Sequence, residues 1–144
     1  MKLVLQRVKN ASVTIDNEVY SSINKGLLIL IGIEKGDVDT DVEKFADKVS
    51  KLRIFSDEND KMNLSVMDIS GEILVVSQFT LAGDCKKGTR PSFDKSAPPD
   101  IANRMYEDFI ARLAAKGIPV KTGVFGAMME VSLVNDGPVT FILG

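Results

Sequence analysis

Histidine and tryptophan are absent from this sequence of 144 residues, and the only cysteine is Cys85. Without histidine the chain cannot build a Ser–His or Cys–His nucleophile pair, or a metal site with imidazole ligands. With one cysteine it cannot form an intrachain disulfide, a pattern that fits a reducing compartment. These absences exclude most hydrolase templates, so any catalysis must use backbone groups, hydroxyls or the substrate itself.

Other common signals are also missing. The sequence has no GxGxxG or GxxxxGK[ST] phosphate-binding loop and no apolar run near the roughly 20 residues of a membrane span. The first stretch, MKLVLQRVKN, carries charges inside its apolar run and no secretory cleavage signal. With 18 Lys and Arg against 20 Asp and Glu, a polyanionic partner must meet a local basic patch. We therefore expect a soluble cytoplasmic protein with one domain, residues 1–144, that needs no cofactor, no metal and no membrane.

Strand-like patterns open and close the chain. Turn residues at Asp16-Asn17 and at Lys25-Gly26 separate the first apolar segments, which predicts an antiparallel meander. Alternating or continuous apolar residues predict strands at 2–9 and 11–15, near 19–20, and at 27–33, 72–79, 128–134 and 138–143.

Helical periodicity predicts two amphipathic helices. In the first, Thr40 and Glu43 have the spacing of a capping box, and apolar residues recur at helical spacing up to Leu52. The second helix starts at Pro98-Pro99-Asp100 and ends before Gly117 and Pro119. Its apolar face is formed by Ile101, Met105, Phe109 and Leu113. Strands and helices together predict an α+β fold.

Two segments are predicted to be irregular. Residues 83–100 hold three prolines, two glycines and several charges, which predicts a long surface excursion. The acidic stretch SDENDK at 56–61 lacks the central glycine and closing glutamate of a calcium-binding loop, which favours a solvated turn.

The stretch SQFTLAG at 77–83 places polar residues where an apolar strand ends, which is common both at active sites and at ordinary turns. Thr80 lacks a neighbouring base that could make it a nucleophile. The backbone N–H groups of Gln78 and Phe79 are therefore better candidates for holding an oxyanion.

The terminal stretch LVNDGPVTFIL at 133–143 contains Gly137-Pro138 inside what otherwise reads as a buried strand. Proline lacks the N–H that a strand ladder requires and glycine weakens a strand interior. The pair predicts either an edge strand or turn, or a backbone bend with a cis peptide bond.

Several motifs together resemble the D-aminoacyl-tRNA deacylase family, formerly called D-tyrosyl-tRNA deacylase. They span the chain in order: QRV (6–8), ASV (11–13), LRIF (52–55), KMNLS (61–65), VVSQFTL (75–81), KKGTRPSF (86–93), FGA (125–127) and NDGPVT (135–140). The resemblance implies a homodimer with a mixed, mainly antiparallel β-sheet or barrel-like core, flanking helices and active sites at the subunit interface. It implies hydrolysis of the ester of D-aminoacyl-tRNA and of glycine mischarged onto the tRNA for alanine.

The resemblance also implies roles for single residues. Gly137 and Pro138 would form a cis pair that projects into the partner's site and bars an L side chain by backbone contact. The segment Ser77, Gln78, Phe79 and Thr80 would hold the ester carbonyl while the ribose 2′-hydroxyl assists water. Phe125 and Met129 would contact the terminal adenine, with core packing as the alternative. Arg7 would support the Gly–Pro pair, or it is simply an exposed strand residue.

The local basic patch consists of Lys86, Lys87, Arg90 and Lys95, which would contact tRNA phosphates unless the segment is only a solvated loop. The sequence departs from the family pattern at Ala82-Gly83, Cys85 and Met128, which concerns local pocket shape. A tRNA-binding module without turnover and a dimeric scaffold are the alternatives to an enzyme.

Overall fold

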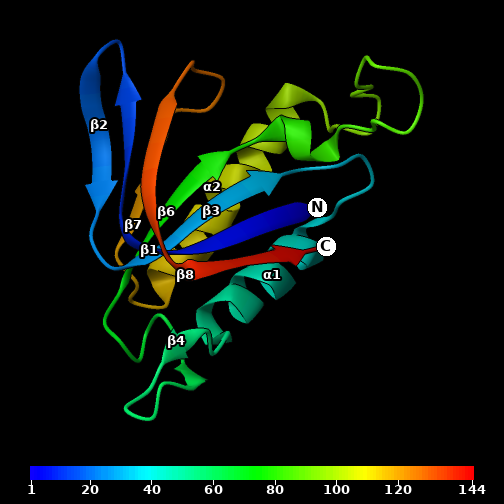
Figure 1. The fold of residues 1–144 in the computed structure, drawn as a ribbon. Coiled ribbons are helices and arrows are strands. Elements are labelled where there is room, and N and C mark those ends of the chain that lie inside the picture. The colour runs from blue at the N-terminus through cyan, green and yellow to red at the C-terminus, as the bar shows by residue number, and fades with distance from the viewer.

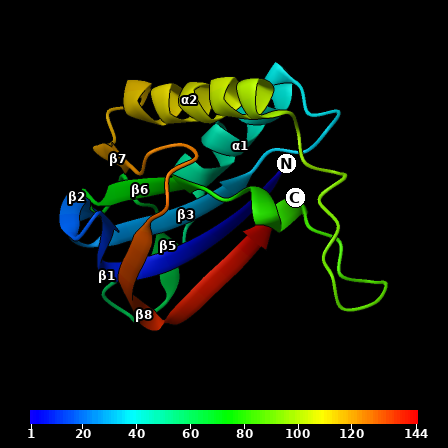
Figure 2. The same ribbon diagram turned by 90° about the horizontal axis from the view of Figure 1, so that it is seen from above.

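The computed structural model describes all 144 residues as one α+β domain in which two helices cover a curved sheet (Figures 1 and 2). Its elements, in chain order, are β1 (Lys2–Ile15), β2 (Glu18–Ile23), β3 (Gly26–Gly32), α1 (Asp39–Lys51), β4 (Phe55–Ser56), β5 (Met62–Leu64), β6 (Glu72–Ser77), the 3₁₀ turn η1 (Phe79–Ala82), α2 (Pro99–Ala115), β7 (Val120–Thr122) and β8 (Glu130–Leu143).

The first three strands pair antiparallel, with β2 and β3 both lying along the long, bent strand β1. Ala11 pairs with Ile23 and Val8 pairs with Gly26, so the register continues unbroken from β2 to β3 along the same strand, β1. The predicted meander is wrong, because β2 and β3 follow each other beside β1 and do not pair with each other. The predicted break in the first strand is also absent, since β1 is continuous.

The remaining strands complete a mixed, nearly closed, barrel-like sheet. β3 pairs with β6 in parallel and β6 pairs with β7 in parallel, whereas β8 runs antiparallel to β1. The sheet order explains the continuous apolar run of β3, because both faces of that strand are covered. β4 and β5 form a separate small hairpin around the acidic segment, which confirms the predicted turn there.

Alternate residues of the central strands supply two cores. Leu27, Ile29 and Ile31 belong to the larger core, which lies between the sheet and the two helices. Leu28 belongs to a smaller core inside the bend of the sheet, with Val8 and Val13 from β1. Side chains therefore pack against both faces of the sheet. This packing holds the sheet in its curved shape.

The helices occur where the sequence predicts them, with differences at one cap and one face. α1 starts at Asp39, and the N–H of Val38 donates to Asp41 Oδ2 over 2.9 Å, so the predicted Thr40–Glu43 capping box is wrong. α2 starts at Pro99 as predicted. Met105, Phe109 and Leu113 are buried, but Ile101 in the first turn is 40% exposed, because it is Ala102 that faces the core in this turn.

Two other strand boundaries differ from prediction. The strand predicted at 72–79 ends at Ser77, where the chain enters η1. The two strands predicted at 128–134 and 138–143 form one strand, β8, which runs through Gly137 and Pro138. Sequence analysis missed β7, which is only three residues long.

Candidate active site

A cavity of about 740 Å³ lies where the end of β6 meets the start of α2 and the loop between β7 and β8. Most of its lining is apolar, with a few polar groups from Ser77, Gln78 and Ser96. Large apolar clefts with few convergent polar groups are the usual form of small-molecule and cofactor sites. This cavity is therefore the candidate active site.

The first wall is the turn that follows β6. Ser77, Gln78 and Phe79 line the cavity, and the side-chain amide of Gln78 donates to Thr80 Oγ1. The hydrogen bond that closes the turn runs from Leu81 N to the carbonyl oxygen of Gln78 over 3.2 Å. The N–H groups of Phe79 and Thr80 lie before this bond in the chain, at positions where N–H groups have no acceptor within the turn. Thr80 itself does not line the cavity.

One predicted oxyanion donor is wrong. The N–H of Gln78 donates to the carbonyl oxygen of Ile31 over 2.8 Å, which extends the pairing between β3 and β6 by one residue. A donor held in the sheet is not available to a substrate. Phe79 stays as the predicted backbone donor of this segment.

The second wall comes from the segment between η1 and α2. Phe93 packs edge-on against Phe79 with ring centroids 5.2 Å apart, and both rings line the cavity. Ser96 Oγ donates to the carbonyl oxygen of Phe79 over 3.4 Å. The predicted surface excursion therefore returns to the site, and the sequence analysis missed the contributions of Phe93 and Ser96 to the wall.

The third wall is the loop between β7 and β8, where Phe125 and Met129 line the cavity and also pack against the larger and the smaller core, respectively. Phe125 packs on Tyr106 of α2 with ring centroids 6.0 Å apart. The Tyr106 hydroxyl donates to the carbonyl oxygen of Val75 over 2.9 Å, and burial raises the pKa of Tyr106 to about 12. Met128 lies at the mouth of the cavity and is 92% exposed.

Gly137 and Pro138 lie on a bulge of β8. Gln6 pairs with Thr140 and Val8 pairs with Asn135, so the four residues 136–139 stand opposite Arg7 alone. Their connecting peptide bond is cis, and both residues are exposed.

Side chains hold the bulge at both ends. Arg7 is buried rather than exposed, and its Nε donates to the carbonyl oxygen of Asp136 over 2.9 Å. At the other end the Asn135 carboxamide accepts from the N–H of Val139 at 2.6 Å and donates to its carbonyl oxygen at 3.2 Å. The sequence analysis missed Asn135, although its place at the start of NDGPVT was visible.

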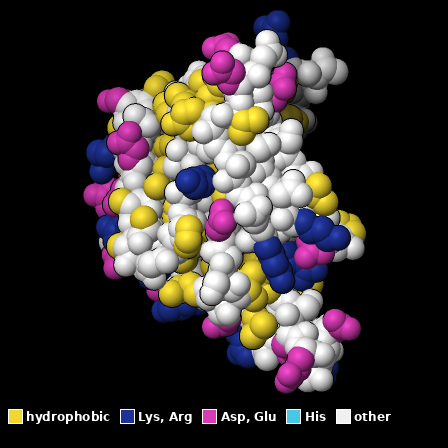
Figure 3. Space-filling model, turned by 90° about the vertical axis from the view of Figure 1, so that its left-hand side faces the viewer, with side chains coloured by type: hydrophobic (Ala, Val, Ile, Leu, Met, Phe, Trp, Pro, Cys, Tyr) yellow, Lys and Arg dark blue, Asp and Glu magenta, His cyan; other side chains and the backbone are white.

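The bulge does not line the cavity of its own chain. It belongs to β8, which pairs only with β1 and therefore leaves a 14-residue strand with an open edge. Val134, Phe141 and Ile142 are exposed apolar residues of this strand. Figure 3, which shows the side of the molecule that carries β2, has further hydrophobic side chains exposed at several places.

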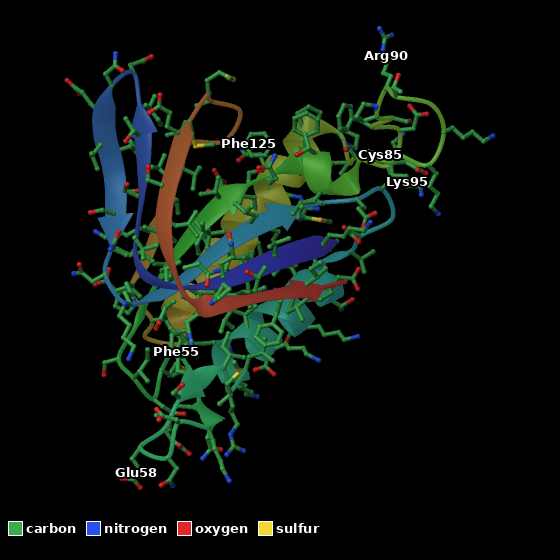
Figure 4. All side chains as sticks on the ribbon, in the orientation of Figure 1. Phe55, Glu58, Cys85, Arg90, Lys95 and Phe125 are labelled. Atoms are coloured by element: carbon green, nitrogen blue, oxygen red, sulfur yellow. The ribbon has the colours of Figure 1, made fainter.

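The predicted basic patch lies on the exposed excursion between η1 and α2. Figure 4 places Cys85, Arg90 and Lys95 on this excursion, with Phe125 on a separate loop. Lys95 Nζ forms an ion pair with Asp84 Oδ2 at 3.3 Å. None of Lys86, Lys87, Arg90 and Lys95 lines the cavity.

No three carboxylate or thiol groups come together in an arrangement that could hold a metal ion. No helix has the length and apolar character needed to cross a membrane. The cavity offers backbone donors, hydroxyl and amide groups, aromatic surfaces and one ammonium group, from Lys35, which the sequence analysis also missed. Such a set can polarise a carbonyl group and stack a planar ring.

Comparison with known proteins gives concordant matches. The family model described as D-Tyr-tRNA(Tyr) deacylase matches residues 4–144. The chain is 62% identical over 143 residues to the D-aminoacyl-tRNA deacylase of Thermodesulfovibrio yellowstonii, covering 99% of this chain and 98% of that protein. It is 55% identical to the D-aminoacyl-tRNA deacylase of Thermosipho africanus, covering 99% and 96%.

Two solved structures share the fold. The c-Myc DNA Unwinding Element Binding Protein superposes with a TM-score of 0.95 at 43% identity, covering 100% of this chain and 98% of that one. A probable eukaryotic D-amino acid tRNA deacylase superposes with a TM-score of 0.85 at 16% identity, covering 99% and 97%, a likeness that concerns the fold alone.

Proposed function

The chain belongs to the D-Tyr-tRNA(Tyr) deacylase family and is a hydrolase that acts on the ester of D-aminoacyl-tRNA, and on this premise we propose how its parts divide the reaction. The observation that carries the proposal is the cavity between the Ser77–Phe79 turn and the Phe125–Met129 loop. It offers a polar turn for an ester at one wall and apolar side chains for a base at another.

Cleavage takes place at the turn after β6. The ester carbonyl lies against this turn, where the Phe79 N–H stabilises the oxyanion that forms when water adds to the carbonyl carbon. The 3′-oxygen of the ribose leaves with a proton, and the free D-amino acid is released. The cavity lining contains no carboxylate or imidazole, which supports assistance by the ribose 2′-hydroxyl, already held beside the ester.

Thr80 acts as a positioning residue for this turn. Its hydroxyl accepts the hydrogen bond from the Gln78 side chain and lies outside the cavity lining, which supports positioning over nucleophilic attack. Phe125 and Met129 hold the terminal adenine, since Phe125 is braced by Tyr106 and offers a fixed ring for stacking.

Discrimination between D and L esters comes from a second copy of the chain. The two esters differ only in the direction in which the side chain leaves Cα, so a filter must fill the L direction with rigid atoms. Gly137 and Pro138 suit this task because they are exposed on a bulge that Arg7 and Asn135 hold. Glycine has no side chain, so glycine mischarged onto the tRNA for alanine passes the same filter.

A homodimer is required by this arrangement, since the bulge is not part of its own cavity. The open edge and exposed apolar side chains of β8 support it, because long unprotected edge strands are otherwise prone to aggregation. Lys86, Lys87, Arg90 and Lys95 then face the tRNA backbone, and the enzyme works in the cytoplasm, where aminoacyl-tRNA is used.

The test compares release of tyrosine from D-Tyr-tRNA and L-Tyr-tRNA, together with the oligomeric state by sedimentation. We expect a dimer and a preference for the D ester of about a thousandfold or more, which needs only ~4 kcal/mol between transition states. Protection of both esters without release indicates a binding module, and neither effect indicates a scaffold.

Gly137→Ala tests the filter. An added Cβ would lie 2.7 Å from Val139 Cγ2 and 3.3 Å from Arg7 Nη2, so the bulge must shift and the D/L ratio must fall. Gly117→Ala is the matched control, because Gly117 also has a positive φ but open space around it. An unchanged D/L ratio in a folded Gly137→Ala dimer contradicts the filter.

A further inference from the structure

Lys35 is the one residue with an ionisable side chain among the 16 that line the cavity. It lies in the loop between β3 and α1, and its side chain is exposed. We infer that Lys35 binds the phosphate that joins the terminal nucleotide to the rest of the tRNA. This inference rests on the proposed function and adds a phosphate subsite to it.

The ammonium group of Lys35 has no ion-pair partner in its own chain, although two carboxylates flank it in sequence. Glu34 Oε1 accepts from the N-terminal ammonium of Met1 at 3.0 Å, and Asp37 Oδ1 accepts from the same group at 2.7 Å. The second oxygen of Asp37 accepts from the N–H of Glu34. Both neighbouring carboxylates are therefore occupied, and the charge of Lys35 is left for a ligand.

The backbone that carries Lys35 is fixed to the cavity wall. Its N–H donates to the carbonyl oxygen of Lys95 over 2.9 Å, and Glu34 forms a β-bridge with Ser96. The N–H of Ala97 donates to the carbonyl oxygen of Ile33 over 3.1 Å. A lysine at a fixed place on the rim loses less conformational freedom on binding than one on a mobile loop.

The chemistry of the substrate places an anion at the rim. With the ester at the Ser77 turn and the base against Phe125, the 5′-phosphate is the anionic group of the terminal nucleotide, and the tRNA strand leaves the cavity at this phosphate. Lys35 is the only cation of the lining, and its backbone pairs with the segment of Lys95, at the base of the excursion that carries Arg90 (Figure 4). A tRNA strand that leaves the cavity at Lys35 therefore passes next to the segment that carries Lys86, Lys87 and Arg90, whereas Lys95 is already paired with Asp84.

The experiment uses two small substrates that differ in one group, 3′-O-(D-tyrosyl)-adenosine and its 5′-phosphate. The variant is Lys35→Gln, and Lys44→Gln on the exposed side of α1 is the matched control, because it makes the same charge change and breaks no ion pair. For the wild-type enzyme we expect kcat/KM to be about tenfold higher with the 5′-phosphate, as one charge-assisted contact provides.

In Lys35→Gln the higher kcat/KM with the 5′-phosphate should disappear, because KM for the phosphorylated ester rises. Turnover of the unphosphorylated ester should stay unchanged. With full-length D-Tyr-tRNA, the slope of log KM against log salt concentration should decrease by the amount that corresponds to about one phosphate contact. Lys44→Gln should match the wild type in every assay.

Each other outcome overturns the inference in a recognisable way. Equal wild-type turnover of both small esters excludes a phosphate subsite and leaves the proposed function standing. An equal loss with both esters in Lys35→Gln means that the residue acts on the fold or on the ester, and not on phosphate. If the wild type hydrolyses neither small ester and no D-Tyr-tRNA, the proposed function fails and the inference fails with it.

Discussion

The side chain of Arg7 ties two distant segments together, since Nε donates to the carbonyl oxygen of Asp136 at 2.9 Å and Nη1 donates to that of Ile54 at 2.9 Å. One contact holds the bulge of β8, and the other holds the chain just before β4. A buried guanidinium suits this place because its planar fork can serve two acceptors in different directions. The bulge is therefore fixed to the body of the domain, and not only to its own strand.

We predict that Arg7→Lys destabilises the fold and lowers turnover of D-Tyr-tRNA. A single ammonium cannot reach both carbonyl groups, and a buried carbonyl without a donor costs about 1–3 kcal/mol. Urea unfolding measures the loss. Arg53→Lys is the control, because Arg53 also donates to a backbone carbonyl, that of Asn63, but at an exposed site. Equal urea midpoints for Arg7→Lys and the wild type would show that the two contacts contribute nothing.

A second prediction concerns Asn135. In Asn135→Asp the acceptor for the Val139 N–H stays, but the donor to the Val139 carbonyl oxygen is lost and a carboxylate faces that oxygen. We expect a loss of about 1 kcal/mol at pH 7. Protonation restores a donor, so stability relative to the wild type should be recovered as pH falls through about 4, the ordinary range of an aspartate pKa.

Urea midpoints at pH 7 and pH 3.5 check this prediction. Asn17→Asp is the control, since Asn17 lies in the exposed turn between β1 and β2. A deficit in Asn135→Asp that is the same at both pH values contradicts the role of the amide donor.

Tyr106 provides a prediction at alkaline pH. Burial raises its pKa from 10.0 to about 12, so the folded state favours the neutral phenol. This contribution to stability is complete below pH 10 and is lost as pH rises toward about 12, because the unfolded chain releases the proton first. Tyr106→Phe cannot ionise, so its free energy of unfolding should fall less steeply across this window.

At neutral pH the same variant should lose only about 0.5–1.5 kcal/mol, the net value of one hydrogen bond. The Val75 carbonyl oxygen keeps a second donor there, the N–H of Gly123 at 3.2 Å. Urea titrations of both proteins from pH 7 to pH 11 measure the two slopes. Parallel curves would mean that Tyr106 does not ionise differently in the folded state.

Local patterns in the sequence predicted the elements in which buried residues recur at a regular spacing. Met105, Phe109 and Leu113 are spaced for one helix face, and the helix and its face occur as predicted. The cap of α1 was missed because several acidic residues compete there, and only the folded chain shows that Asp41 reaches the N–H of Val38. The spacing of apolar residues identifies a helix, whereas the residue at which the helix begins depends on single hydrogen bonds.

Contacts between distant segments could not be predicted from spacing. The register that joins β2 and β3 beside β1, and the bulge opposite Arg7, both arise from pairing over long separations. Lys35 reaches the cavity only because its backbone pairs with Lys95, far along the chain. The motifs therefore predicted which segments form the candidate site, whereas the way these segments enclose the cavity could be seen only in the folded chain.

The last prediction uses the close approach of Gly123 to Met129. A Cβ on Gly123 would lie 2.6 Å from Met129 Sδ, and a methionine side chain can move away at low cost. Gly123→Ala should therefore fold but push Met129 into the cavity, raising KM for D-Tyr-tRNA more than it lowers kcat, because the adenine contact that we propose for Met129 is remote from the ester. Gly26→Ala is the contrast, since its Cβ would collide with the backbone oxygen of Glu72 and disrupt the pairing of β3 with β6.

A double-mutant cycle separates displacement of Met129 from a general disturbance of the β7–β8 loop. In a Met129→Ala background the sulfur is gone, so Gly123→Ala should have little further effect on KM, and the two substitutions should be strongly non-additive. If Gly123→Ala raises KM by the same factor in both backgrounds, the change acts through the backbone of the loop. Displacement of Met129 is then not the cause of the raised KM, and the prediction for Gly123→Ala is wrong.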